Sequence, residues 1–333
     1  MEKYKVAWGH FLLAEEVKKR LPPDGFEVVS CPSQGDLEKS VSDADFLVVG
    51  RYVKATREMI EKGKRLKLIQ RTGRFYENRV DLEAATKARI PVAVIMPVMA
   101  IAVAETAMAL MLALSKQLLE AHRLTISGAY EKRGLKPEPT AERRIPNANW
   151  MNMSPQVLYG KTLGIIGMGE IGYAVAERGK GFGMKVIYHD LSRLPLRYEQ
   201  EVGAAYLPFE TVLREADYVT VHVPHTQQTE RLLDGQALSL MKKSAFLINC
   251  SRGGVIDEDA LHKALERGAL GGAGLDVYFI EPVPKDSPIL KLKNVVLTPH
   301  IASPGALGIM DFAQICANIV GVANGESPLG VVT

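Results

Sequence analysis

The sequence predicts an α/β protein made of two doubly wound parallel-sheet domains, and three observations support this. Short apolar runs alternate with helical stretches through the first part of the chain, which is typical of a parallel sheet with crossover helices. An apolar run at residues 162–166 ends in three closely spaced glycines and then turns helical. A chain of 333 residues is also long enough for two domains, each with its own core.

Strands are expected in the first domain where short apolar runs are bounded by turn residues. These runs cover residues 4–8, 26–30, 46–50, 66–70 and 92–95. Helical candidates lie between them, at residues 12–21, 57–62 and 82–87. Because strand and helix alternate, we expect a compact α/β unit. We expect this substrate domain to be flavodoxin-like.

A long helix is expected from about residue 100 to residue 126, followed by a surface excursion over residues 128–155 that is rich in Pro, Asn and charge. The apolar run at residues 97–114 approaches the length of a membrane span. It holds Glu105 in its middle and continues into a charged segment. A buried amphipathic helix is therefore expected, and no membrane is predicted as a partner.

The second domain begins with the glycine motif of residues 162–173. Residues 163–166 form the expected buried strand, and Gly167 and Gly169 let the backbone turn tightly and approach a pyrophosphate. Gly172 lets helix and strand pack closely. The motif therefore predicts a Rossmann dinucleotide site.

A helix expected at residues 170–181 directs its N-terminal amides, including those of Glu170 and Ile171, toward the phosphates. A second strand at residues 185–190 ends in Asp190, about twenty residues after the glycines, where a ribose-binding carboxylate belongs. A carboxylate accepts hydrogen bonds from a ribose 2′-hydroxyl but repels a 2′-phosphate, so NAD is favoured over NADP. Arg193 lies close enough in sequence to neutralise Asp190 or to bind a phosphate, which leaves use of NADP open.

Later strands are expected at residues 218–223, 245–249, 272–277 and 295–297, and a closing helix at residues 304–323. Because the closing helix follows the last strand, it can cross back to the first domain. We expect a discontinuous substrate domain at 1–101 and 303–333, an NAD-binding domain at 102–302, and an active-site cleft between them.

Composition points to a globular protein of the cytoplasm. The chain is 47% apolar and 24% charged, and its net charge of +3 is too small to imply a nucleic-acid partner. The three cysteines lie far apart, without a CxxC or Cys/His cluster, so neither a disulfide framework nor a metal site is indicated. The first residues contain no apolar core of signal-peptide length.

Three residues in loops that follow apolar strands of the second half stand out: Arg252, Glu281 and His300. Reduction of a 2-oxo acid requires a hydride donor, a cation that holds the carboxylate, and an acid that protonates the new alkoxide. Arg252 suits the second task because its planar guanidinium matches a carboxylate. His300 suits the third, and an adjacent Glu281 would orient the imidazole and stabilise its cation.

The sequence resembles the NAD-dependent D-isomer-specific 2-hydroxyacid dehydrogenases, through motifs in family order along nearly the whole chain. The motifs are Gly-Lys-Thr-Leu-Gly-Ile-Ile-Gly-Met-Gly-Glu-Ile-Gly at 160–172, Leu-Ile-Asn-Cys-Ser-Arg-Gly at 247–253, Gly-Leu-Asp-Val at 274–277, Glu281-Pro282, and Thr-Pro-His-Ile-Ala at 298–302. This resemblance implies the roles given above for Arg252, Glu281 and His300.

The resemblance further implies that Asp276 receives the nicotinamide carboxamide, and that Val223, Pro224, Thr229 and Cys250 line the cofactor. It also implies a homodimer built around the long helix and the excursion that follows it. The partner molecule it implies is a small 2-oxo or 2-hydroxy acid.

The substrate side departs from the family pattern. The family's loop resembles Gly-x-Gly-x-Asp-Asn-hydrophobic-Asp, whereas residues 73–81 read Gly-Arg-Phe-Tyr-Glu-Asn-Arg-Val-Asp. A second family segment, near Asn-Thr-Pro-Gly-x-Asn-Ala, appears as Val-Ile-Met-Pro-Val-Met-Ala at 94–100. Backbone amides of the Gly73 loop should hold the substrate carboxylate, and Met99 replaces a polar contact. These changes leave the substrate open.

Two interpretations of the substrate pocket remain. One is a roomy apolar site for a branched or aromatic side chain, walled by Tyr52, Phe75, Met96, Val98 and Met99. The other places Arg51 and Arg74 on a second anion, because Arg51 resembles the arginine that phosphoglycerate-oxidising relatives place after a similar strand. The apolar pocket is slightly favoured.

Two further functions remain as alternatives. Transcriptional corepressors resemble the same family, so an NAD-sensing binding protein is one alternative. Another is an enzyme that acts on an unusual substrate such as formate or phosphite.

Overall fold

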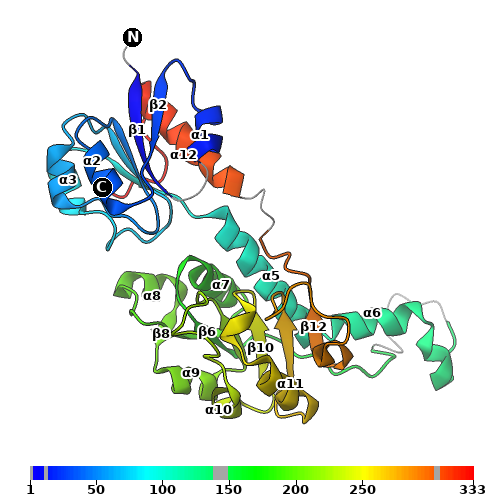
Figure 1. The fold of residues 1–333 in the computed structure, drawn as a ribbon. Coiled ribbons are helices and arrows are strands. Elements are labelled where there is room, and N and C mark those ends of the chain that lie inside the picture. Colours follow the sequence, from blue (N-terminus) through cyan, green and yellow to red (C-terminus); the bar gives the residue numbers. More distant parts are fainter. Residues whose placement is uncertain (1–2, 11–13, 138–148, 304–307) are drawn as a thin grey trace. The chain divides into compact units, whose positions relative to one another are not determined.

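The computed structural model describes residues 3–10, 14–137, 149–303 and 308–333, and it separates into two compact units (Figure 1). Unit 1 consists of Met1–Ile101 and Ser303–Thr333, and unit 2 of Ala102–Ala302. Each unit is built on its own parallel sheet.

The sheet of unit 1 has five parallel strands in the order β2-β1-β3-β4-β5. The strands are β1 Tyr4–Gly9, β2 Phe26–Ser30, β3 Phe46–Val49, β4 Leu68–Arg71 and β5 Val92–Val94. The helices are α1 Ala14–Arg20, α2 Gln34–Ser40, α3 Arg57–Lys62, α4 Leu82–Lys87 and α12 Gly308–Ala323. This strand order is flavodoxin-like, as the sequence predicts.

The core of unit 1 lies on both faces of its sheet, because alternate residues of a strand point to opposite faces. Val6 and Trp8 of β1 join one cluster, and Ala7 joins the other. Trp8 packs against Phe312 of α12 at 5.6 Å between ring centroids. Asn318 of α12 donates to Gln70 Oε1 at 2.8 Å. The C-terminal helix is therefore part of the first core, beside α1 (Figure 1).

The sheet of unit 2 has seven parallel strands in the order β12-β11-β10-β9-β6-β7-β8. The strands are β6 Thr162–Ile166, β7 Lys185–His189, β8 Ala204–Tyr206, β9 Tyr218–Val221, β10 Phe246–Asn249, β11 Gly272–Leu275 and β12 Val295–Leu297. Starting from β6, this is the Rossmann order with a seventh strand added beside β11. It confirms the predicted fold class.

Helices complete unit 2 around this sheet. They are α7 Glu170–Gly181, α8 Leu196–Val202, α9 Phe209–Glu215, α10 Gly235–Leu240 and α11 Glu258–Glu266, with short 3₁₀ turns η1 Ala129–Arg133, η2 Gly253–Val255 and η3 Pro288–Lys291.

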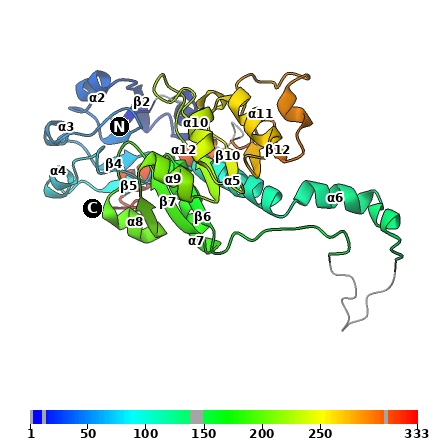
Figure 2. The same ribbon diagram turned by 90° about the horizontal axis from the view of Figure 1, so that it is seen from below.

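The prediction of one helix over residues 100–126 is wrong. The segment forms α5 Val98–Ser115 and α6 Leu118–Ile126, separated by Gln117 in the left-handed conformation with φ 51°. The carbonyl of Ser115 accepts from the amide of Gln156 at 2.7 Å, so it does not continue the helix. Figure 2 shows α6 extending from the body of unit 2.

Helix α5 is long and apolar enough to cross a membrane by length and composition alone. A little over half of it, 56%, is buried inside the protein, which is also typical of a core helix. Leu110 and Leu114 pack against Gly274 of β11, where a Cβ would meet Leu110 Cβ at 2.8 Å. The small residue on the strand therefore lets α5 lie close to the sheet.

Candidate active site and cofactor site

The glycine turn between β6 and α7 has the shape of a phosphate cradle. A Cβ on Gly167 would meet the His222 carbonyl at 2.8 Å, and a Cβ on Gly172 would meet the Gly167 oxygen at 2.1 Å. Gly169 caps α7 and faces open space, with no heavy atom within 4 Å of an added Cβ. Backbone at the start of α7, including Glu170 and Ile171, is therefore open to an anion at the positive end of the helix.

Asp190 follows β7 and closes one side of this turn. Its Oδ2 accepts from the Met168 amide at 2.7 Å, and its Oδ1 accepts from the Ser192 amide at 3.2 Å. The carboxylate thus lies beside the glycine turn, where an acid can meet a ribose hydroxyl.

The loop after β9 borders the same turn. A Cβ on Gly167 would meet Val223 Cγ1 at 2.8 Å, so Val223 packs directly against the glycine backbone. Thr229 Oγ1 donates to the Pro224 carbonyl and accepts from the Thr226 amide at 2.8 Å. Val223, Pro224 and Thr229 therefore form one ordered segment beside the glycine turn.

Arg252 is exposed on a tight turn after β10. Asn249 organises the turn: its Oδ1 accepts from the Ser251 amide at 2.9 Å, and its Nδ2 donates to the Arg252 carbonyl at 3.0 Å. A Cβ on Gly253 would meet the Tyr278 carbonyl carbon at 1.9 Å, so the turn lies tightly against the segment after β11. Asn249 was not predicted from the sequence, although an asparagine ending an apolar strand was the available signal.

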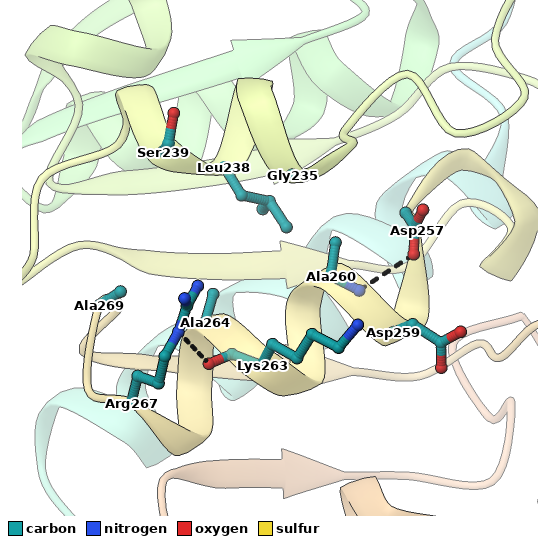
Figure 3. A pocket seen from close by; sticks show the side chains of 10 residues that line it. All are labelled: Gly235, Leu238, Ser239, Asp257, Asp259, Ala260, Lys263, Ala264, Arg267 and Ala269. Atoms are coloured by element: carbon teal, nitrogen blue, oxygen red, sulfur yellow. Dashed lines mark hydrogen bonds between the residues drawn. The ribbon is translucent and has the colours of Figure 1, made fainter.

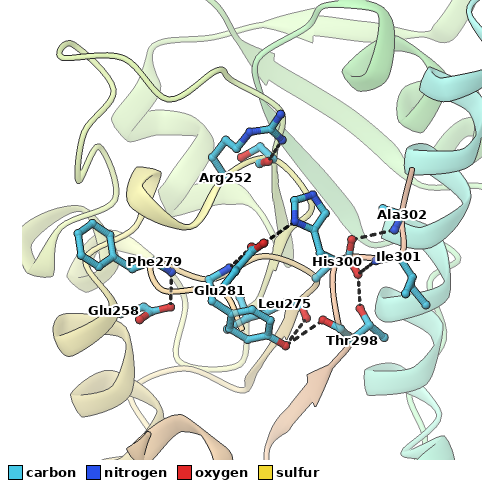
Figure 4. Close-up of polar contacts among 12 residues, drawn as sticks. Arg252, Glu258, Leu275, Phe279, Glu281, Thr298, His300, Ile301 and Ala302 are labelled. Carbon is cyan, nitrogen blue, oxygen red and sulfur yellow. Dashed lines mark hydrogen bonds and ion pairs between the residues drawn. The ribbon is translucent and has the colours of Figure 1, made fainter. Parts of the chain in front are cut away.

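Glu281 and His300 form a hydrogen-bonded pair near Arg252 (Figure 4). His300 Nδ1 lies 2.6 Å from Glu281 Oε2, and Glu281 Oε1 accepts from the Tyr278 amide at 3.0 Å. The His300 side chain is 42% exposed and the Glu281 side chain is 35% exposed, so both are accessible from solvent. The structure thus brings the three predicted catalytic residues together on unit 2.

The environment of Glu281 keeps it ionised. Partial burial acts to raise the pKa of Glu281, but the hydrogen bonds from His300 and Tyr278 and the charges of His300 and Arg252 outweigh burial and lower this pKa. An ionised carboxylate only accepts hydrogen bonds. His300 Nδ1 is therefore the donor in the pair, which leaves Nε2 outside it.

Asp276 holds the loop that carries His300. Its fully buried carboxylate accepts from Thr298 Oγ1 at 2.6 Å, from the Ile301 amide at 2.9 Å and from the Ala302 amide at 2.9 Å. His300 lies in the left-handed region with φ 56°, which is uncommon for a side chain other than glycine. The bonds on either side of His300 stabilise that conformation (Figure 4).

Cys250 lies next to this region and is buried. Burial, together with the Asp276 charge, raises the pKa of the Cys250 thiol well above its usual range. The thiol is therefore neutral and unsuited to act as a nucleophile.

Three predicted substrate residues, Arg51, Gly73 and Arg74, follow β3 and β4. These strands are neighbours, with Val49 paired to Arg71. Arg51 is exposed just after β3, while Gly73 is buried in the loop after β4. Arg74 Nη2 lies 3.6 Å from Met96 Sδ, and Met99 is 38% exposed in the first turn of α5. One end of this sheet therefore presents both cations and sulfur-containing side chains.

Arg71 is a residue of this end that was not predicted from the sequence. It is buried, and it donates to the Phe75 carbonyl at 3.1 Å and to the Val49 carbonyl at 3.2 Å. The guanidinium thus ties the Gly73 loop to the end of β3. The available signal was an arginine that ends an apolar strand.

A separate surface hollow lies between α10 and α11 (Figure 3). Its charged groups serve local structure: Asp257 caps α11 through the Ala260 amide at 3.0 Å, and Arg267 Nε donates to the Lys263 carbonyl at 3.0 Å. None of the predicted site residues line it. The hollow is therefore distinct from the glycine turn and the Glu281–His300 pair.

Comparisons with known proteins identify the family of the chain. Residues 108–302 match the family model described as D-isomer specific 2-hydroxyacid dehydrogenase, NAD binding domain. A glyoxylate reductase of Thermococcus litoralis is 38% identical over 329 residues, which is 95% of each chain. A D-3-phosphoglycerate dehydrogenase of Methanocaldococcus jannaschii is 38% identical over 275 residues, 82% of this chain and 48% of the relative.

Solved structures extend the likeness to the whole fold. The TT0316 protein of Thermus thermophilus is 34% identical with a TM-score of 0.54, and the match covers 99% of this chain and 100% of that chain. The matches support an NAD-dependent oxidoreductase, and the cradle at Gly167, Gly169 and Asp190 fits that cofactor. This chain belongs to the D-isomer specific 2-hydroxyacid dehydrogenase family.

Proposed function

We propose that this enzyme reduces a 2-oxo acid with NADH through Arg252, Glu281 and His300. The observation that carries the proposal is the 2.6 Å contact between His300 Nδ1 and Glu281 Oε2. It gives an imidazole a fixed orientation and an ionised partner, on the same unit as the dinucleotide cradle. NADH, when bound, supplies the hydride.

Arg252 is proposed to bind the substrate carboxylate and polarise the neighbouring carbonyl. Its side chain belongs to an ordered turn, and its positive charge helps to lower the pKa of Glu281. A guanidinium stays protonated at any working pH and can bind a carboxylate through two parallel hydrogen bonds. The same cation stabilises negative charge that develops on the carbonyl oxygen.

His300 is proposed to protonate that oxygen through Nε2. Because Nδ1 donates to Glu281, Nε2 is the nitrogen free to give a proton to substrate. Glu281 stabilises the imidazolium before transfer and holds the ring in place. In the oxidative direction the same nitrogen accepts the hydroxyl proton.

The cofactor contacts are proposed residue by residue. The amides at Gly169, Glu170 and Ile171 would receive the pyrophosphate, and Asp190 would receive the ribose hydroxyls. Val223, Pro224, Thr229 and Cys250 would line the remainder, and Asp276 would receive the nicotinamide carboxamide in addition to holding the His300 loop.

Glyoxylate is the first substrate to test, because the T. litoralis relative bears that name and aligns over 95% of both chains. Backbone amides of the Gly73 loop would bind the substrate carboxylate. Met99, which is 38% exposed, would contact the substituent on C2 of the substrate. A branched or aromatic 2-oxo acid remains compatible with Phe75, Met96 and Met99.

A second candidate is a phosphoglycerate-type substrate. It is favoured by Arg51, exposed at the end of β3, and by Arg74 in the loop after the adjacent β4. A relative named D-3-phosphoglycerate dehydrogenase supports the same alternative. These two arginines would bind a second anion at C3.

Steady-state NADH oxidation separates the candidates. The panel is glyoxylate, pyruvate, hydroxypyruvate, 3-phosphohydroxypyruvate, 2-oxoisocaproate and phenylpyruvate. We expect kcat/KM to be highest for a substrate without a charged group on C3. Arg51→Gln should change kcat/KM for that substrate little. If 3-phosphohydroxypyruvate dominates and Arg51→Gln removes that preference, the second candidate is correct. Silence with every 2-oxo acid while NADH still binds would refute the proposed function.

We also propose that two copies associate through α6 and residues 149–157. Large apolar side chains are exposed there: Leu118, Leu119, Ile126, Trp150 and Val157. Groups of exposed large apolar side chains often mark protein–protein contact surfaces. Light scattering should give twice the chain's 36.5 kDa, and Leu119→Glu with Ile126→Glu should halve that mass. Leu290→Glu, at another exposed leucine, should not change it.

A further inference from the structure

Arg193, in the loop after β7, is paired with a carboxylate, although its side chain is 59% exposed. Its Nε donates to Glu199 Oε1 at 2.9 Å, and its Nη2 donates to Glu199 Oε2 at 2.8 Å. This two-pronged geometry uses both oxygens of the carboxylate and is the strongest form of such a pair.

Glu199 is itself fixed from a second side. It is 4% exposed on α8, and Oε1 also accepts from Tyr188 OH at 2.7 Å. The hydrogen bond from Arg193 lowers the pKa of Glu199 against the effect of burial, so the carboxylate stays ionised at neutral pH. Tyr188 is a core residue of β7, and its oxygen accepts from the Leu194 amide at 2.9 Å. One network therefore joins strand, loop and helix.

The loop lies beside the residue expected to bind the adenosine ribose. Asp190 Oδ1 accepts from the Ser192 amide at 3.2 Å, one residue before Arg193. In Rossmann domains an arginine near this position accommodates the 2′-phosphate of NADP. Arg197, the next arginine along the chain, stacks on the Tyr198 ring with 4.6 Å between its Cζ and the ring centroid.

We propose that Glu199 is a specificity residue that excludes NADPH by holding the guanidinium of Arg193. With the pair intact, the loop offers the 2′-phosphate an ionised Asp190 and an arginine whose charge is already neutralised. With the pair broken, Arg193 can turn to the phosphate and offset Asp190. The inference rests on the nucleotide site described above, and it assigns a role to a residue outside that site.

Calorimetric titration with NADH and with NADPH tests it on four proteins: wild type, Glu199→Gln, Arg193→Gln and the double variant. Glutamine keeps the shape of Glu199 and still accepts from Tyr188, but it cannot hold the guanidinium as an ion pair. We expect Glu199→Gln to bind NADPH about tenfold more tightly than wild type, the equivalent of one charge-assisted hydrogen bond. Its NADH affinity should stay within about twofold.

The other two variants identify the group responsible. The double variant should lose the gain in NADPH affinity, and Arg193→Gln alone should leave NADPH affinity as in wild type. Unchanged NADPH affinity in Glu199→Gln, with NADH still bound, would overturn the inference. So would weaker NADPH binding in Arg193→Gln, because Arg193 would then reach the phosphate despite the pair. Failure of NADH to bind wild type would instead refute the cofactor site itself.

Discussion

His300 Nδ1 lies 2.6 Å from Glu281 Oε2, and the second oxygen of Glu281 is occupied by the Tyr278 amide. The two contacts hold the carboxylate against the imidazole. They also fix which ring nitrogen can meet a substrate. In the proposed mechanism, proton transfer depends on this pair, and each member can be tested separately.

Glu281→Gln should lower kcat by roughly 10²–10⁴-fold, the range for a positioned acid that loses its orienting charge. The glutamine NH₂ would donate to His300 Nδ1 and reverse the tautomer, so the imidazolium would no longer be stabilised. NADH affinity should not change, as measured by titration calorimetry.

Glu258→Gln is the matched control, since Glu258 also accepts a backbone amide, from Phe279 at 3.0 Å, without contacting His300. Its kcat should stay near wild type. Equal losses in the two variants would show that the effect of Glu281 is structural.

Arg252→Lys should lower kcat/KM by about 10²-fold, because lysine keeps the charge but cannot bind a carboxylate through two parallel hydrogen bonds. Arg252→Ala should lose nearly all turnover. NADH binding should survive in both, and Arg267→Lys, directly after α11, should change neither turnover nor NADH binding. Wild-type turnover in Arg252→Ala would remove the residue from the mechanism.

Asp276→Asn should destabilise unit 2 by about 1–3 kcal/mol, the cost of leaving a buried donor without its acceptor. The carboxylate accepts three hydrogen bonds from the His300 loop, and the amide's NH₂ would face one of those donors. Urea unfolding measures the change, with exposed Asp286→Asn as control. A free energy of unfolding equal to that of wild type would contradict this role.

His222 should make the protein less stable in acid. Its Nδ1 is shielded from solvent with no partner among the described residues, and burial lowers the pKa of His222 to about 3. The unfolded chain binds this proton below its ordinary pKa of 6.5, whereas the folded chain does not. Stability is therefore present above pH 6.5 and is lost as pH falls, by at most about 1.4 kcal/mol per pH unit.

Urea unfolding of wild type and His222→Gln from pH 6 to pH 4 isolates this contribution, since the carboxylates act equally in both proteins. The variant should show the shallower dependence on pH. His262→Gln, on α11, should follow wild type. Parallel curves for wild type and His222→Gln would show that His222 is protonated in the folded state.

Periodicity predicts the elements whose apolar pattern is strong. One motif predicts the strand before Gly167 and the helix at 170–181, because its glycines are typical of a tight strand–turn–helix connection that binds phosphate. Helix α2 escaped prediction because it is short and buries only Leu37, and its capping box at Ser33 is a weak signal in sequence. The break at Gln117 depends on Gln156, which is remote in sequence.

The candidate site was predictable where a residue's chemistry is unusual for its position. Arg252, Glu281 and His300 each follow a strand and match a family motif, so their loops could be selected from sequence. The hydrogen-bond partners of site residues could not be predicted. Sequence spacing indicates neither the ion pair between Glu199 and Arg193 nor the hydrogen bonds from the His300 loop to Asp276. Such hydrogen bonds exist only after helices and strands have packed.

The most direct test of the mechanism is kcat/KM for glyoxylate reduction as a function of pH, in wild type and in His300→Asn. Reduction consumes the imidazolium proton, so the wild-type rate should fall as pH rises and the proton donor is lost. His300→Asn should be slower by roughly 10²–10⁴-fold and should lose that fall, while it still binds NADH. A variant that keeps the wild-type rate and pH profile would contradict the assignment of His300 as the proton donor.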